Sequence, residues 1–340
     1  MIALPTYALA AWKLTKRLKF SEVTMNISGS YIKGVLLVLL SALCFSISGT
    51  LQALAPEGSN PFIITEMRMI IGSLFLYFWC RAFKKLPHSY KDLPWKSLFI
   101  CAIFLLIGQL CFFTGMANIG VAAGAVISIG SAPIFAAIIS RIFFKISPPK
   151  AWYAATFLAI AGVALINGGD LNQSRLFFIL ILLTDGLTYA AYINFSSKLG
   201  DKLDSDAAVM LILAIIAVAL SPVLFIFPIS WTYSSLNGIF VCLGLGIFTG
   251  GMAFAFLTSG ARLVSPAVAS TLCLAEPLGA VCWGIFLLKE ETSLTTLLGI
   301  ASVLLSIIVL VFFAKEPKKP SNPKAQEISQ IQSSSTIPDV

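Results

Sequence analysis

Long apolar runs alternate with short polar segments along most of the 340-residue chain. An α-helix rises about 1.5 Å per residue, so it needs about 20 residues to cross a hydrocarbon core about 30 Å thick. Ten runs have roughly this length: residues 32–54, 61–83, 95–117, 120–144, 151–168, 175–197, 207–229, 236–260, 264–288 and 295–313. The pattern therefore predicts an all-α integral membrane protein with ten transmembrane helices.

The distribution of charge agrees with this number of spans. When the N-terminus is placed in the cytoplasm, 20 of the 23 Lys and Arg residues fall in cytoplasmic connections and in the two tails. Arg175 and Lys289 lie in outer loops, and Arg68 lies within a span. This asymmetry follows the positive-inside rule. We therefore expect a multi-pass protein of a bacterial inner membrane with both termini cytoplasmic, and no nucleic-acid partner, because the basic residues do not gather on one face.

Two polar segments flank the apolar runs. Residues 1–30 are predicted to be a cytoplasmic extension, in which the basic cluster follows the apolar stretch Ile2–Trp12. That order is wrong for a cleaved signal peptide. It stays open whether residues 1–24 are translated natively, because Met25 directly precedes a typical membrane-protein opening. Residues 315–340 are rich in Lys, Pro, Ser and Gln and are predicted to be a disordered cytoplasmic tail.

The chain matches itself at an offset of 144 residues without gaps. Ile103-Phe104 meets Ile247-Phe248, and Pro133 meets Pro277. The matches share one register, which predicts two five-helix repeats over residues 31–170 and 171–314. Because five is odd, the second repeat must enter the membrane in the opposite orientation. Inverted repeats of this kind are characteristic of secondary transporters.

Ionisable residues inside a span are expensive and usually face a cavity or a partner. Four qualify, namely Glu66, Arg68, Asp185 and Glu276, and each is a candidate for ion pairing or for coupling. Asp185 and Glu276 fall near mid-membrane, where transport sites are expected. Arg68 is interpreted either as a ligand for an anionic substrate group or as a clamp between helices.

Asp185 begins a polar stripe at helical spacing that continues through Tyr189 and Tyr192. The repeat mate of this stripe contains Phe45 and Ser48. We predict that these faces line a cavity, while interhelical hydrogen bonding remains the alternative. The predicted substrate-binding residues are Asp185, Tyr189, Tyr192, Glu276, Arg68, Phe45, Ser48 and Gln109.

Two prolines occupy equivalent positions in the repeats. A proline inside a helix removes one backbone hydrogen bond and frees a carbonyl four residues earlier. Pro133 and Pro277 are therefore predicted to mark kinks or gates, although structurally neutral kinks would leave the same pattern.

These residues together resemble the EamA group of the drug/metabolite transporter superfamily. The resemblance rests on Glu66-Met67-Arg68, Ser131-Ala132-Pro133, Ala275-Glu276-Pro277-Leu278 and Leu287-Leu288-Lys289-Glu290-Glu291. It implies a central cavity lined mainly by helices 1, 3, 4, 6, 8 and 9, and alternating access. It also implies substrates such as amino acids, purines or nucleotide-like cofactors including S-adenosylmethionine. Where family members often end the fourth helix with an acid, this chain has Arg141 and Lys145.

Other functional classes lack their signatures. The single histidine, His88, lies in a predicted loop, and no HExxH motif, phosphate-binding loop or CxxC pair is present. We therefore expect no enzyme activity, no cofactor and no bound metal. A passive channel stays open as an alternative to a secondary transporter. The expected partners are a small metabolite and the lipid bilayer, with a proton or a counter-substrate as the optional coupling species and the oligomeric state undetermined.

Overall fold

The computed structural model describes residues 29–119, 121–166, 176–199, 203–279, 283 and 293–313, and the regular elements among them are all helical. The elements of the first half are α3 (Gly29–Ser46), α4 (Ser48–Ala53), α5 (Pro61–Ala82), α6 (Trp95–Ile119), α7 (Val121–Phe144) and α8 (Lys150–Ile166). Those of the second half are α9 (Leu176–Ser196), α10 (Ser205–Leu220), α11 (Val223–Ile226), η3 (Ser230–Thr232), α12 (Leu236–Gly244), η4 (Leu245–Met252), α13 (Ala253–Ala261), α14 (Pro266–Leu272), η5 (Cys273–Ala275) and α16 (Leu294–Phe313).

Seven helical segments in the described part of the chain are long and apolar enough to cross a membrane. Two further apolar helices, Lys150–Leu165 and Leu297–Leu310, are shorter. The predicted number of ten spans is therefore not confirmed, because these two fall short in length and the predicted span 264–288 lies partly outside the described residues. Large apolar side chains such as Phe225 and Phe157 project from the bundle, as expected where lipid replaces water.

The helices begin where the local sequence caps them. Asn60 accepts a hydrogen bond from the backbone N–H of Phe62 at 2.9 Å, and Pro61 occupies the first helical position of α5. Ser265 and Pro266 repeat this arrangement at the start of α14. Such residues satisfy backbone donors that the first turn leaves unpaired, so the polar segments between apolar runs end one helix and start the next.

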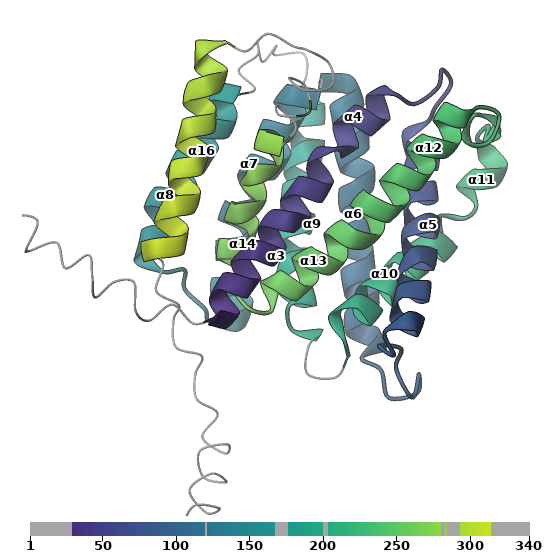
Figure 1. Ribbon diagram of the computed structural model, residues 1–340, viewed down its shortest axis with the longest axis horizontal. Coiled ribbons are helices and arrows are strands. Elements are labelled where there is room, and N and C mark those ends of the chain that lie inside the picture. The colour runs from purple at the N-terminus through teal and green to yellow at the C-terminus, as the bar shows by residue number, and fades with distance from the viewer. Residues whose placement is uncertain are drawn as a thin grey trace, which may run out of the picture.

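Repeat-related helices pack side by side in antiparallel directions. α8 and α16 lie together at one edge of the bundle (Figure 1). Ser302 donates to the carbonyl of Leu158 at 2.7 Å, while Gly162 faces Gly299. Trp152, near the start of α8, belongs to the same buried cluster as Leu310, and Val163, near its end, belongs to that of Val303, so the two helices run in opposite directions.

The pair α5 and α10 shows the same relation at the other edge of the bundle (Figure 1). Lys85, just beyond the end of α5, forms an ion pair with Asp206 in the first turn of α10, with 2.5 Å between Nζ and Oδ2. Phe62, at the start of α5, stacks on Phe227, just beyond α11. The contacts between the two halves thus join opposite ends of equivalent helices.

The centre of the molecule is formed where the first long helix of each half crosses the third of the other. Phe45 of α3 packs edge-to-face on Phe254 of α13, with ring centroids 4.9 Å apart. Phe104 of α6 stacks near Phe195 of α9. Two irregular elements interrupt the second half here, the π-helical η4 and the 3₁₀ turn η5. These crossings and irregularities surround the candidate site.

Candidate functional site

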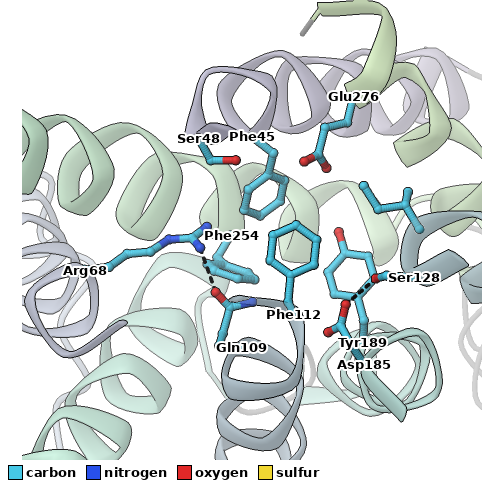
Figure 2. A pocket seen from close by; sticks show the side chains of 11 residues that line it. Phe45, Ser48, Arg68, Gln109, Phe112, Ser128, Asp185, Tyr189, Phe254 and Glu276 are labelled. Atoms are coloured by element: carbon cyan, nitrogen blue, oxygen red, sulfur yellow. Dashed lines mark hydrogen bonds between the residues drawn. The ribbon is translucent and has the colours of Figure 1, made fainter. Parts of the chain in front are cut away.

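A cavity lies between helices of both halves. Its walls combine aromatic rings with hydroxyl, amide and charged groups (Figure 2). They are formed by Phe45, Ser48, Arg68, Gln109, Phe112, Ser128, Ile129, Asp185, Tyr189, Phe254 and Glu276. The structure therefore brings together all the predicted substrate-binding residues except Tyr192, and adds α5 to the helices that the resemblance implies.

Arg68 reaches the cavity from α5 and is only 2% exposed. Its Nη1 donates to Oε1 of Gln109 at 2.6 Å, and its Nη2 donates to the carbonyl of Thr249 at 2.8 Å. The guanidinium carbon also lies 5.6 Å and 5.5 Å from the ring centroids of Phe45 and Phe254, within the range of cation–π attraction. Arg68 thus joins helices of both halves. The acceptors of these two hydrogen bonds are uncharged oxygens.

Asp185 enters the cavity from α9 at the point where α6 and α7 approach closely. Ser128 of α7 donates a hydrogen bond to its Oδ2. A Cβ added to Gly108 of α6 would lie 2.9 Å from Oδ1 of Asp185 and 2.8 Å from the hydroxyl of Thr188. The absence of a side chain at Gly108 therefore leaves the room that the carboxyl group occupies.

Glu276 approaches the cavity from the helical residues 276–279 that follow η5. Proline has no backbone N–H to continue a helix, and Pro277 stands directly after Glu276. The structure tightens into a 3₁₀ turn at Cys273–Ala275, immediately before this pair. By contrast, α7 continues from Val121 to Phe144 through Pro133. A gating role for either proline stays a prediction.

Tyr189 and Tyr192 lie in different surroundings although they belong to one predicted stripe. Tyr189 lines the cavity, with its hydroxyl directed at the sulfur of Cys273 at 3.6 Å. Tyr192 is fully buried behind the wall, where its hydroxyl pairs with that of Thr258 at 2.9 Å and its ring packs on Phe254. The direct substrate contact expected of Tyr192 therefore has no counterpart in this arrangement, because Phe254 covers it.

Glu66 is also outside the cavity lining. It is fully buried, and neither of its carboxyl oxygens has a hydrogen-bond partner in the part of the chain that the structure describes. Its position two residues before Arg68 directs it away from that side chain, as the helical spacing predicts. A coupling role for Glu66 remains a prediction.

Four wall residues were not predicted, namely Phe112, Ser128, Ile129 and Phe254, and three of them carried no usable signal in the sequence. The chain has 26 phenylalanines, so one more within an apolar run is uninformative. Ser128 is different, because it stands one helical turn before Ser131-Ala132-Pro133. The helical spacing therefore places Ser128 on the same face as Ser131.

Comparison with known proteins decides the family. The profile described as the EamA-like transporter family matches residues 32–168 and again residues 176–312. The chain belongs to the EamA-like transporter family. Both ends of the two EamA matches are displaced by the offset of 144 residues found within the sequence, which confirms the internal repeat.

Named relatives of this EamA protein are bacterial. It is 31% identical to the uncharacterized transporter YwfM of Bacillus subtilis (strain 168) over 297 residues, which cover 86% of this chain and 98% of that protein. It is also 31% identical to the uncharacterized transporter YdfC of the same strain over 150 residues, covering 42% of this chain and 46% of that one. These matches and the apolar helices make the chain a multi-pass membrane transporter.

A crystal structure of a protein with 17% sequence identity has the same fold. The superposition has a TM-score of 0.72 and covers 83% of this chain and 97% of that one. At this low sequence identity, the superposition shows that the two proteins share a fold and nothing more.

Proposed function

We propose that this EamA-family protein is a secondary transporter that moves a zwitterionic metabolite of the amino-acid type by alternating access. The observation that carries the proposal is the placement of opposite charges in one cavity. Figure 2 shows Arg68 on one side, Asp185 and Glu276 on the other, and the rings of Phe45 and Phe112 between them. A molecule with a carboxylate, an ammonium group and an apolar side chain complements all three features.

Among the described residues, Arg68 forms no ion pair with Asp185 or Glu276, so its N–H donors and their carboxyl groups remain available to a ligand. Arg68 donates to the neutral oxygens of Gln109 and Thr249. Asp185 accepts from the hydroxyl of Ser128. Buried ionisable groups inside a membrane mark pathways for substrates and ions, and this set supports recognition of both ends of a zwitterion.

Alternating access is supported by the relation between the halves. We infer ten spans in two repeats of opposite orientation, with both termini cytoplasmic and with substrate bound where the repeats meet. The antiparallel packing of α5 on α10 and of α8 on α16 agrees with such an inversion. Two equivalent but oppositely oriented bundles can open the same cavity first to one side and then to the other.

Transport by purified protein in vesicles tests the proposal. We expect saturable uptake of amino acids, with nucleotide-like compounds bearing an amino-acid end, such as S-adenosylmethionine, as the competing candidates. The double variant Asp185→Asn/Glu276→Gln should lose most of this uptake, because it removes both partners for the ammonium group. Glu57→Gln, in an exposed loop, is the matched control and should transport normally.

The alternative of a passive channel predicts a different kinetic behaviour. A carrier exchanges labelled substrate outside for unlabelled substrate inside, so preloading the vesicles should accelerate uptake. A pore would show neither this acceleration nor saturation. Unchanged uptake in the double variant would remove Asp185 and Glu276 from the binding site.

A further inference from the structure

An irregular stretch of the helix formed by α12, η4 and α13 holds the guanidinium group of Arg68. The segment Leu245–Met252 is π-helical, with backbone hydrogen bonds between residues five apart and a widened turn. Within it, the carbonyl oxygen of Thr249 accepts the hydrogen bond from Nη2 of Arg68. π-Helical turns are rare and occur often at functional sites, so this turn is a candidate for setting the position of Arg68.

Glycines allow the backbone of η4 to approach α5 at this point. A Cβ added to Gly250 would lie 2.7 Å from the backbone oxygen of Arg68 and 3.1 Å from its Cγ. The oxygen is part of a helix backbone and cannot move by itself. A side chain at Gly250 would therefore push the two helices apart exactly where Thr249 meets the guanidinium.

The remaining donors of Arg68 depend on these bonds. A guanidinium has five N–H donors in a rigid planar fork. Nη1 is fixed by Gln109 and Nη2 by Thr249, while Nε has no partner among the described residues. Two anchored nitrogens fix the plane of the fork and hence the direction in which its other N–H groups face the cavity.

We propose that Gly250, through the adjacent Thr249 carbonyl, is a positioning residue that adjusts Arg68 to receive the carboxylate of the substrate. The inference rests on the function proposed above and extends it to a residue that does not line the cavity. Gly250 acts on Arg68 and not on the ammonium side of the site. Disturbing it therefore weakens ligands that carry a carboxylate and spares ligands that lack one.

The helix interface offers a matched control. Gly251→Ala places its Cβ 2.7 Å from Cδ1 of Phe75 and 3.4 Å from the oxygen of Gly72. It fills the same interface, but its three nearest atoms belong to Phe75 and Gly72 and not to Arg68, and the closest is a side-chain atom. Gly72→Ala serves as a milder second variant should Gly250→Ala not fold, since its Cβ would lie 3.1 Å from the backbone carbon of Gly250.

Ligand-induced thermal stabilisation measures the effect with two probes. L-Leucine carries both charged groups, whereas isoamylamine has the same side chain and ammonium group without the carboxylate. We expect Gly250→Ala to raise the Kd for leucine about tenfold, as for one lost hydrogen bond to a charged group, and to leave the Kd for isoamylamine within about twofold. Gly251→Ala should leave both values near those of the wild type. Equal weakening of both probes, or equal effects of the two variants, would overturn the proposal.

A measurement without substrate separates this inference from the proposed function. In protein with isotope-labelled arginine, Arg68→Lys assigns the side-chain NMR signals of Arg68. We expect Gly250→Ala to shift these signals and Gly251→Ala to leave them in place. If the wild type binds neither probe, the amino-acid function fails, and the NMR signals alone decide whether Gly250 positions Arg68. Unshifted signals in Gly250→Ala would refute it.

Discussion

At the scale of single residues, Asp185 depends on the missing side chain of Gly108. The carboxyl oxygen and the hydroxyl of Thr188 occupy the volume that a Cβ there would need. Small residues permit such close helix approach within membranes. The position of the Asp185 carboxyl group is therefore fixed by the neighbouring helix as much as by its own helix.

We predict that Gly108→Ala lowers the affinity for transported substrate by about tenfold or more, because displacing a hydrogen-bonded charge costs roughly 1.5–3 kcal/mol. The KM of uptake in vesicles measures this effect. Gly130→Ala on α7 is the control, since no other described residue lies within 4 Å of its added Cβ. Equal KM values for the two variants would show that Gly108 has no influence on Asp185.

Much of the site could be predicted at this scale because charge in a membrane is costly. Asp185, Glu276 and Arg68 stand out in apolar runs, and Phe45 and Ser48 follow from the repeat mate of the Asp185 stripe. Tyr192 fits the same helical spacing, but the stripe is wide enough that its last members turn toward α13. No rule of spacing assigns Phe254 or Phe112 to the cavity, since aromatic residues of a lipid-facing surface look identical in sequence.

At the scale of elements, a polar link at one end of their spans joins the end of α5 to the start of α10. Lys85 and the indole N–H of Trp79 both donate to Oδ2 of Asp206, at 2.5 Å and 3.1 Å. Partial burial lowers the pKa of Lys85, but the hydrogen bond and the charge of Asp206 outweigh it, so this pKa lies above the ordinary value of 10.5.

We predict that Asp206→Asn lowers the free energy of unfolding by about 1 kcal/mol, a value reduced for the partial exposure of Lys85. Because the pKa of Lys85 is raised on folding, the link contributes fully below pH 10.5 and is lost only as the pH rises through the higher, folded value. Thermal unfolding in detergent between pH 7 and pH 10 should therefore give a constant difference from the wild type.

The control for this link is Asp204→Asn. It removes a neighbouring negative charge but keeps a good N-cap for α10, because asparagine and aspartate cap equally well. It should unfold like the wild type. If both variants lose the same free energy of unfolding, the loss comes from removing a negative charge near Lys85 and not from breaking the contact between Asp206 and Lys85.

The elements themselves were predictable to the extent that hydrophobicity determines them. The apolar run 236–260 predicts one span and the structure has one, but its π-helical turn at Leu245–Met252 leaves no trace in the pattern. The 3₁₀ turn at Cys273–Ala275 could be anticipated because Pro277 follows it. A widened turn needs only a local rearrangement of backbone hydrogen bonds. The apolar side chains of the run are compatible with either arrangement, so the sequence pattern does not distinguish a π-helical turn from an α-helical one.

At the scale of the whole molecule, the two halves are copies, and two pairs of equivalent helices, α5 with α10 and α8 with α16, pack side by side in opposite directions. The two repeats could be predicted from the sequence, because all the matches between the halves share one gap-free offset of 144 residues. The number of spans could not be fixed in the same way. Helices such as Lys150–Leu165 and Leu297–Leu310 are shorter than the apolar runs that contain them.

Opposite orientation of the copies leads to a further prediction. Ser89 and Tyr233 are repeat mates, and both are exposed in loops. In single-cysteine variants of a cysteine-free background, a membrane-impermeant reagent should label Ser89→Cys only from the cytoplasmic side and Tyr233→Cys only from the outer side. Labelling of both from one side would mean that the repeats are parallel.

Arg68 is held by hydrogen bonds to uncharged groups, so its charge can interact with the electrical potential across the membrane. Its hydrogen bonds to Gln109 and Thr249 hold the guanidinium without cancelling its charge. An elementary charge carried through a potential of 100 mV changes in energy by about 2.3 kcal/mol. In the proposed transport cycle, we therefore expect the membrane voltage to affect any step that moves Arg68 across part of the field. The empty and the loaded protein should respond differently, because a bound carboxylate would move together with that charge.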